Sequence, residues 1–325
     1  MGNNYLVVLT DADHFPLDVE HKEALRRAGA EVIGVPHGAT EQQLAEICKD
    51  ADALLVFAAK ITQRIIQSSH LKIIARCGIG YDNIDLQYAF EQGITVTYVP
   101  DFCLEEVSDH TIALMLDCWR KLSYSRDQAR NGHWWDTMQK LSPLRRIKGQ
   151  SIGLIGFGRI AQSVARKLSG FGVTLVAYDP FVPQSVMQDL GVQPVSLSEL
   201  LRVSDVVSLH TPLTDQTRHM MNRQLFEQMK DGAIFINTSR GPLLKEEDLL
   251  WALNSGKLSA AGLDVLEVEP PVPNHPLTQM TQVIVTPHTA AYSDTALHEV
   301  KARAIEEVIR KFNGLPPHNP VPMKR

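Results

Sequence analysis

The chain has 325 residues, of which 44% are hydrophobic and 21% charged, ordinary values for a globular protein of about two domains. Its net charge of −5 at pH 7 gives no reason to expect direct binding to nucleic acid. No apolar run approaches the ~18 residues of a membrane helix. We also expect no secretion signal, because no basic segment precedes an apolar run at the N-terminus.

The cysteines and histidines show no metal-binding spacing. The four cysteines (Cys48, Cys77, Cys103 and Cys118) lie far apart with no C-x-x-C pair, and none of the twelve histidines forms an H-x-x-x-H motif. The sequence therefore predicts no metal site. It predicts buried, reduced thiols, which are typical of the cytoplasmic location that we expect.

Short apolar runs alternate with helix-like segments in the first third of the chain. Strands are predicted at 5–10, 31–35, 53–57 and 73–75, and helices at 19–29, 41–48 and 63–68. This alternation predicts a parallel sheet covered by helices. Thr10-Asp11-Ala12-Asp13 follows the first strand in place of a glycine-rich turn, so this sheet has no phosphate-binding fingerprint.

A second alternating series fills the rest of the chain. One long helix is predicted over about 104–124, and the segment 131–148, with two tryptophans and mixed charge, is interpreted as a loop or arm. Strands are then predicted at 151–155, 174–178, 206–209, 233–237, 260–263 and 283–285, before a final helix over about 294–312. The fold class is therefore α/β, with two parallel sheets.

The segment 151–161 combines a strand, a glycine turn and the start of a helix. Its fingerprint is Gly156-x-Gly158-x-x-Ala161, followed by a predicted helix at 162–170. Gly156 permits a tight turn, Gly158 lets a pyrophosphate approach the backbone, and Ala161 lets the helix lie close to the strand. The helix N-terminus offers free N–H groups and partial positive charge to phosphates. The residues expected to contact the cofactor here are Gly156, Phe157, Gly158, Arg159 and Ile160.

The next predicted strand ends in Asp179, about 20 residues beyond the fingerprint. An acidic side chain there accepts hydrogen bonds from the ribose hydroxyls and repels the extra phosphate of NADP. Pro180 and Phe181 supply no arginine to receive that phosphate, so the sequence predicts NAD as the cofactor. The alternative is a glycine turn in a doubly wound fold that binds no nucleotide.

Three consecutive strands each deliver a titratable or charged residue to one sheet edge. Arg240 follows the strand at 233–237, Glu269 follows the strand at 260–263, and His288 follows the strand at 283–285. Ligands bind at the carboxyl ends of strands in open α/β sheets. An arginine can hold a carboxylate, a histidine can exchange a hydroxyl proton, and a neighbouring carboxylate can stabilise the imidazolium.

The sequence resembles the D-2-hydroxyacid dehydrogenase family, which includes phosphoglycerate dehydrogenases, hydroxypyruvate and glyoxylate reductases, and C-terminal-binding-protein corepressors. The matching stretches are 76–85, the glycine fingerprint, 210–214, 237–241, 262–271 and 286–288. The resemblance implies that His288 is the general acid/base, Glu269 is its partner and Arg240 binds substrate. It also implies that NAD contacts Ile79, Thr211, Pro212, Thr217, Thr238, Ser239, Arg240, Asp264 and His288.

The resemblance implies a discontinuous substrate domain and a homodimer. Residues 1–103 and 292–325 would form a smaller flavodoxin-like substrate domain, and 104–291 would form an inserted Rossmann-type NAD domain, with the active site in the cleft. Backbone N–H groups at Ile79 and Gly80 would hold the carboxylate of a small 2-hydroxy or 2-oxo acid. The arm near 125–148 is expected to reach across the dimer, and a substrate lid is the alternative for its tryptophans, Trp134 and Trp135.

The choice of substrate and the alternative functions depend on other positions. Lys60 is expected to meet a distal anion of the substrate, although a solvated lysine is an equal alternative. Phosphoglycerate dehydrogenases typically carry an arginine near the position of Phe57. The corepressors have a tryptophan where this chain has Ala291, and formate dehydrogenase has glutamine where it has Glu269. The alternative to an enzyme is a corepressor-like protein that senses NADH with little turnover.

Overall fold

The computed structural model describes residues 5–322, which divide into two compact units. One unit combines the described residues up to Phe102 with those from Ser293 onward, and the other runs from Cys103 to Tyr292. Within the described residues, no helix has the length and apolar character needed to cross a membrane.

The first unit is a five-stranded parallel sheet in the order β2-β1-β3-β4-β5. Its strands are β1 (Tyr5–Leu9), β2 (Ala30–Gly34), β3 (Ala53–Val56), β4 (Ile73–Arg76) and β5 (Thr95–Thr97). Its helices are α1 (Val19–Arg27), α2 (Glu41–Ile47), α3 (Gln63–Gln67), α4 (Leu86–Glu91) and α14 (Asp294–Phe312). The order is that of flavodoxin-like sheets.

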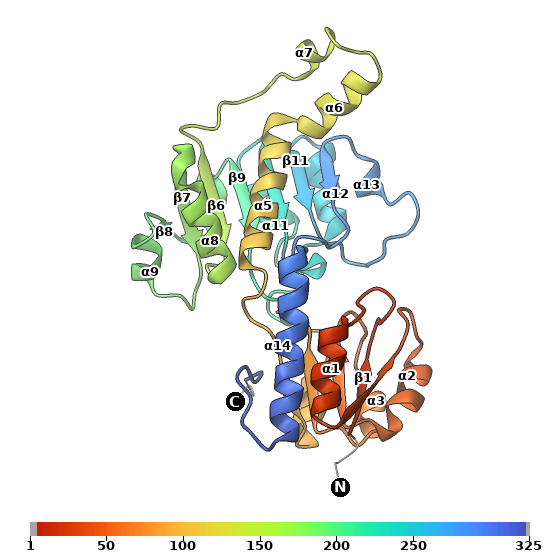
Figure 1. The fold of residues 1–325 in the computed structure, drawn as a ribbon. Coiled ribbons are helices and arrows are strands. Elements are labelled where there is room, and N and C mark those ends of the chain that lie inside the picture. The colour runs from red at the N-terminus through yellow and green to blue at the C-terminus, as the bar shows by residue number, and fades with distance from the viewer. Residues whose placement is uncertain (1–4, 323–325) are drawn as a thin grey trace. The chain divides into compact units, whose positions relative to one another are not determined.

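Two apolar clusters fill the two faces of this sheet. Helices α2, α3 and α4 supply one cluster, and α1 and α14, which lie side by side, supply the other (Figure 1). The strands are nearly continuous apolar runs because both faces are covered. Helix α14 therefore completes the first unit from the far end of the chain.

The second unit is a seven-stranded parallel sheet in the order β12-β11-β10-β9-β6-β7-β8. The strands are β6 (Ser151–Ile155), β7 (Thr174–Tyr178), β8 (Gln193–Pro194), β9 (Val206–Leu209), β10 (Ala233–Asn237), β11 (Leu258–Leu263) and β12 (Val283–Val285). The order reverses between β6 and β9, as in Rossmann folds, and ligands bind at such a switch point. The predicted α/β fold class is confirmed.

Helices cover both faces of the seven-stranded sheet (Figure 1). One face carries α5 (Leu104–Arg120) and α8 (Arg159–Leu168), and the other carries α10 (Leu197–Val203), α11 (Arg223–Gln228) and α12 (Glu246–Asn254). The other α-helices described in this unit are α6 (Leu122–Arg130), α7 (Thr137–Lys140), α9 (Gln184–Gln188) and α13 (Pro276–Gln279). The four cysteine side chains are buried, and no disulfide joins them within the described residues.

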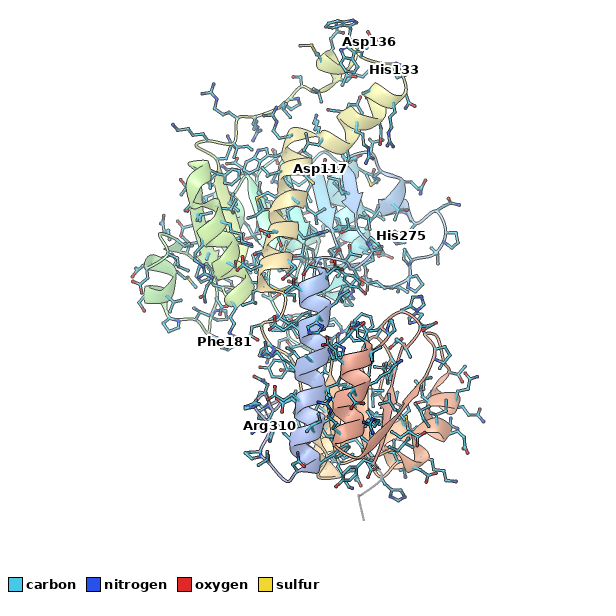
Figure 2. The ribbon with its side chains drawn as sticks, in the orientation of Figure 1. Asp117, His133, Asp136, Phe181, His275 and Arg310 are labelled. Atoms are coloured by element: carbon cyan, nitrogen blue, oxygen red, sulfur yellow. The ribbon has the colours of Figure 1, made fainter. Side chains whose placement is uncertain are left out.

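The single helix predicted over 104–124 is wrong. Lys121 has a left-handed backbone with φ of 51° and separates α5 from α6. Asp117, labelled in Figure 2, accepts hydrogen bonds from Ser123 N at 2.8 Å and Ser123 Oγ at 2.6 Å. The side chain of Asp117 thus ties the start of α6 back to the end of α5, and this local bonding overrides the continuous helical pattern.

Candidate active site

The turn between β6 and α8 has the backbone that its glycines predict. Gly156 has φ of 86°, and a Cβ there would lie 2.7 Å from the carbonyl oxygen of His210. A Cβ at Gly158 would meet no atom within 4 Å, so the space above this residue is open. Ala161 is fully buried, which lets α8 lie close to the sheet. The turn therefore fits a pyrophosphate at the N-terminus of α8.

Asp179 stands at the end of β7, directly beside this turn. Its carboxylate accepts hydrogen bonds from the backbone N–H groups of Phe157 at 2.7 Å, Phe181 at 2.8 Å and Val182 at 3.1 Å. Phe157 and Ile160 pack into the apolar core, whereas Arg159 is exposed. Asp179 thus also fixes the glycine turn, a role that the sequence did not reveal.

The loop after β9 is closed by its own threonines. Thr217 Oγ1 donates to Pro212 O at 2.7 Å and accepts from Thr214 N at 2.8 Å. Thr211 Oγ1 lies 3.6 Å from the sulfur of Met220. Burial lowers the pKa of His210 to about 4, so its imidazole is neutral at pH 7. We assign His210 a structural role at the end of β9.

The end of β10 is held by a set of short contacts. Thr238 Oγ1 lies 2.8 Å from Thr111 Oγ1 of α5, and Ser239 Oγ donates to Leu209 O at 2.8 Å. The Asn237 amide donates to Arg240 O at 2.9 Å, and Arg240 Nη1 donates to Ser239 O at 2.8 Å. These bonds fix the backbone from which the Arg240 guanidinium extends.

His288 and Glu269 form the pair that the sequence predicts. His288 Nδ1 lies 2.7 Å from Glu269 Oε2, and the two side chains are 47% and 36% exposed. Burial raises the pKa of the Glu269 carboxyl. A larger opposite effect comes from the hydrogen bond and charge of His288, the Leu266 N–H group and the charge of Arg240, so the pKa lies below the ordinary 4.5. A carboxylate on Nδ1 leaves Nε2 for proton exchange.

Asp264 organises the loop that carries His288. Its buried carboxylate accepts hydrogen bonds from Thr286 Oγ1 at 2.6 Å and from the N–H groups of Thr289 and Ala290, both at 2.9 Å. His288 itself has a left-handed backbone with φ of 55°. His110 Nε2, on α5, lies 2.8 Å from Thr286 Oγ1 and extends this network. His110 could not be identified from the sequence, because its partners are far away along the chain.

In the first unit, Ile79 and Gly80 lie in a tight turn after β4. Arg76 Nε donates to Gly80 O at 2.7 Å, and Arg76 Nη1 also donates to Cys77 O. Gly78 has φ of 157°, and a Cβ there would lie 2.6 Å from Arg76 Nη1. The side chain of Arg76 thus holds the turn whose amides were expected to receive a carboxylate.

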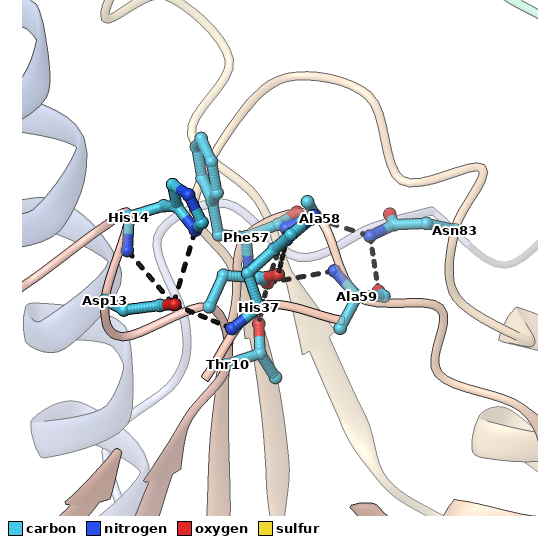
Figure 3. A network of polar contacts seen from close by, with 9 residues as sticks. Thr10, Asp13, His14, His37, Phe57, Ala58, Ala59 and Asn83 are labelled. Carbon is cyan, nitrogen blue, oxygen red and sulfur yellow. Dashed lines mark hydrogen bonds and ion pairs between the residues drawn. The ribbon is translucent and has the colours of Figure 1, made fainter. Parts of the chain in front are cut away.

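The loop before Lys60 is held by hydrogen bonds to the backbone of Ala58 and Ala59 (Figure 3). Asp11 Oδ2 accepts hydrogen bonds from Ala58 N at 2.9 Å and Ala59 N at 3.0 Å, and Asn83 Nδ2 donates to Ala59 O at 2.9 Å. The Lys60 side chain is exposed and lines two cavities of the first unit, of about 590 and 430 Å³. The structure therefore fixes the backbone of this loop and leaves Lys60 open to solvent.

Comparison with known proteins agrees with an NAD-binding α/β enzyme. Residues 112–290 match the D-isomer specific 2-hydroxyacid dehydrogenase, NAD binding domain. The chain is 39% identical over 301 residues to a hydroxypyruvate reductase of Thermotoga maritima, covering 91% of this chain and 96% of that one. It is 36% identical over 311 residues to a D-3-phosphoglycerate dehydrogenase of Methanocaldococcus jannaschii, covering 95% of this chain but 57% of that one.

A solved structure shows the same fold. The D-lactate dehydrogenase of Aquifex aeolicus, complexed with NAD and lactic acid, has a TM-score of 0.84 and 30% identity, covering 95% of this chain and 96% of that one. The chain belongs to the D-isomer specific 2-hydroxyacid dehydrogenase family, which confirms the resemblance seen in the sequence. It is an NAD-dependent oxidoreductase acting on 2-hydroxy acids.

Proposed function

We propose that this chain transfers a hydride reversibly between NAD(H) and a small D-2-hydroxy acid or its 2-oxo acid. His288 acts as general acid/base, Glu269 as its partner, and Arg240 binds the substrate. The observation that carries the proposal is the 2.7 Å contact between His288 Nδ1 and Glu269 Oε2. It supports proton exchange because the carboxylate stabilises a protonated imidazole while Nε2 remains available.

Each side chain has a separate task in this reaction. The Gly156–Gly158 turn would hold NAD(H), which would supply or accept the hydride. His288 donates its Nε2 proton to the developing alkoxide during reduction and takes the hydroxyl proton during oxidation. Arg240 stabilises negative charge on the substrate. Asp179 selects NAD over NADP, and the remaining cofactor contacts come from Thr211, Pro212, Thr217, Thr238, Ser239 and Asp264.

We further propose that the first unit is the substrate domain. The amides of Ile79 and Gly80 would bind the substrate carboxylate, and Lys60 a distal anion. Phosphoglycerate dehydrogenases typically carry an arginine near the position of Phe57, whose ring stacks on Phe15 with centroids 4.2 Å apart. These residues favour a small acid such as glyoxylate or hydroxypyruvate, the latter also in the name of the relative from Thermotoga maritima.

A panel of 2-oxo acids tests the reaction directly. NADH oxidation would be followed at 340 nm with glyoxylate, hydroxypyruvate, pyruvate and short branched oxo acids, with NADPH in parallel and phosphohydroxypyruvate as the phosphorylated comparison. We expect saturable turnover with at least one small acid and a preference for NADH. Tight NADH binding without turnover on any acid would instead support the corepressor-like alternative.

The variant His288→Gln tests the proton-transfer role. We expect turnover to fall by about 10²–10⁴-fold while the Kd for NADH stays within a few-fold of the parent value. His219→Gln is the matched control, because His219 Nε2 also pairs with a glutamate, Glu267 Oε1 at 2.6 Å, and is 43% exposed. Near-parental turnover in His288→Gln would contradict the assignment.

We also propose that the protein is a cytoplasmic homodimer formed by the second unit. The arm around α7, which bears His133 and Asp136 (Figure 2), exposes Trp134 by 68%, Trp135 by 79% and Met138 by 71%. A second copy would cover this apolar surface. Sedimentation should give a dimer that Trp134→Ser with Trp135→Ser weakens. The buried thiols without disulfides support a reducing compartment.

A further inference from the structure

Two histidines and a carboxylate from opposite ends of the chain meet where α1 and α14 pack together in the first unit. Asp18 and His21 lie at the start of α1, and His298 lies in the first turns of α14. One ligand atom from each residue can be chosen so that all three lie within 4.8 Å of one another. The proposed reaction uses none of these side chains.

The imidazole of His21 is buried without a hydrogen-bond partner. The side chain is 4% exposed, and neither ring nitrogen makes a hydrogen bond. Buried polar groups are nearly always paired, so such an atom requires an explanation. Asp18 Oδ2 lies 3.2 Å from Nδ1, but the geometry of this contact is not that of a hydrogen bond.

The side chain of Asp18 does not make the hydrogen bond that is usual at its position. It is the N-cap residue of α1, yet its side chain caps no backbone N–H group. Aspartate at this position normally accepts from the second or third N–H group of the helix. Here the carboxylate faces His21 and is more than half exposed, at 55%, so it is accessible to an ion from solvent.

We propose that Asp18, His21 and His298 form a binding site for a divalent transition-metal ion of the zinc class. Two imidazoles and one carboxylate are ligands that zinc accepts, with water in the fourth position. Bonds of about 2.0–2.2 Å in a tetrahedron separate ligand atoms by about 3.4 Å, close to the 3.2 Å between His21 Nδ1 and Asp18 Oδ2. Small rotations of the side chains complete the set.

Glu20 lies where the outer hydrogen-bond acceptor of a metal-binding histidine is usually found. Its Oε1 lies 3.1 Å from His298 Nδ1. A carboxylate that accepts the proton of one ring nitrogen fixes the tautomer and leaves the other nitrogen to bind metal. Glu20 is therefore the positioning residue of His298 in this proposal: when His298 binds the ion through Nε2, Glu20 accepts the Nδ1 proton.

Lys301 is the competing cation. Its Nζ lies 3.7 Å from Asp18 Oδ2, on a side chain that is 10% exposed, and 5.0 Å from the ring centroid of Phe15. An ammonium group here repels an incoming metal ion and partly neutralises Asp18. Replacing it with the uncharged Lys301→Met, which keeps the packing volume, should therefore tighten metal binding.

Metal binding would link the two chain segments that form the first unit. Helix α14 returns to this unit after the whole second unit has intervened in the chain, and α1 is its helical neighbour. An ion that binds the folded site but not the unfolded chain raises stability by mass action. The proposed metal ion therefore stabilises the folded first unit and takes no part in the reaction.

The test is a titration of the full-length, chelator-treated protein with Zn²⁺ by calorimetry and with Co²⁺ by visible absorption. We expect one high-affinity equivalent, tetrahedral Co²⁺ bands and a Zn²⁺-dependent rise in Tm. His298→Gln should weaken this binding at least tenfold and abolish the rise in Tm. It should fold, since the His298 side chain is 53% exposed. Asp18→Asn should weaken binding as well, and Lys301→Met should strengthen it.

His318→Gln is the matched control. His318 is also 53% exposed and faces a glutamate, Glu306 Oε1, at 3.3 Å. Among the described residues it belongs to no group of three possible metal ligands. Its replacement should leave the Zn²⁺ affinity unchanged. Equal losses of Zn²⁺ affinity in His298→Gln and His318→Gln would show scattered surface binding. The absence of a high-affinity equivalent of Zn²⁺ in the parent protein would show that Lys301 already satisfies the site. Either result overturns the proposal.

Discussion

The pairing of His288 with Glu269 gives a prediction about pH. The folded pKa of Glu269 is below the ordinary value of 4.5, because hydrogen bonding and nearby positive charge outweigh the cost of burial. The pair therefore stabilises the folded protein above about pH 4.5, and this stabilisation is lost as the pH falls through the lower folded pKa. Glu269→Gln should reduce Tm at pH 7, and the difference in Tm from the parent should shrink in acid.

The same variant should impair catalysis more than cofactor binding. Without the anion, a protonated His288 is less stable, so kcat/KM should fall by about 10–100-fold with little change in the Kd for NADH. Thermal melts at pH 7 and pH 4, combined with kinetics, measure both effects. A Tm difference that grows in acid would contradict the assignment of Glu269 as an ionised partner.

Asp11 positions the Lys60 loop, and its replacement should separate substrate binding from cofactor binding. The side chain of Asp11 is 3% exposed, and its Oδ1 lies 2.7 Å from His37 Nδ1. The backbone of Asp11 has φ of 57°. Burial opposes ionisation, but bonds from Thr10, His37, Ala58 and Ala59 keep its pKa below 3.8. Asp11→Asn should cost about 1–3 kcal/mol and lower kcat/KM for the oxo acid while the Kd for NADH is kept.

The neighbouring Asp13→Asn is the control for this variant. Asp13 lies on the same turn and accepts from the N–H groups of His14 and His37, but it is half exposed and touches neither Ala58 nor Ala59 (Figure 3). Chemical denaturation and steady-state kinetics should therefore show a smaller effect. If both variants lower kcat/KM equally, Asp11 has no special role in the loop.

Sequence reasoning found residues that act through local motifs and missed those that act through distant partners. Gly156 and Gly158 were identifiable because turn geometry and ligand approach demand glycine within a few residues. Asp11 and His110 were not assigned these tasks, since each supports a loop contributed by another part of the fold. The Asp18–His21–His298 cluster was invisible for the same reason, because spacing rules detect only ligands close in sequence.

At the scale of elements, Asp179 joins the end of β7 to the glycine turn. Asp179 both carries the predicted selectivity for NAD and accepts three backbone N–H groups. Removing it outright would loosen the turn as well as the selectivity. Asp179→Ser keeps a hydroxyl acceptor, and Phe181→Arg adds a cation at a residue that is 87% exposed (Figure 2).

The double variant Asp179→Ser with Phe181→Arg should shift the ratio of kcat/KM for NADPH over NADH upward by at least tenfold, because one repulsive charge is lost and one attractive charge is gained. Phe181→Arg alone should give a smaller shift, since Asp179 still repels the phosphate. Paired initial-rate measurements with the two cofactors decide the matter. An unchanged ratio in the double variant would refute the role of Asp179 in selectivity.

Elements with strong apolar patterns were predictable, and weak or interrupted ones were not. The predicted bounds of α14 agree with the structure, because its amphipathic period runs from the Ser293 cap, which accepts from Ala296 N, to the end of the helix. Strands β5 and β8 were missed because they have three and two residues and lack an apolar run. The break at Lys121 was missed because the apolar pattern continues across it.

At the scale of the whole molecule, the chain order and the distribution of the cores predict independent folding of the second unit. Residues 103–292 are continuous and contain two apolar clusters of their own, one on each face of the seven-stranded sheet. The first unit is assembled from both ends of the chain, and its clusters join α14 to the N-terminal strands. A fragment of residues 103–292 should therefore fold alone, whereas residues 1–102 should not, because the sheet face that α14 covers would be exposed.

The fragment 103–292 should bind NADH without catalysing turnover, since it contains the glycine turn, Asp179 and the His288–Glu269 pair but not the turn at Ile79 and Gly80. A ligand present at 100 times its Kd adds about 2.7 kcal/mol to the stability of the unit that binds it. NADH should thus raise the Tm of the fragment, and the Asp179→Ser variant of the fragment should show a smaller rise. Circular dichroism and NADH fluorescence measure folding and binding separately. A folded fragment whose Tm is indifferent to NADH would mean that cofactor binding needs the first unit, and a fragment that turns over oxo acids would remove the first unit from the reaction.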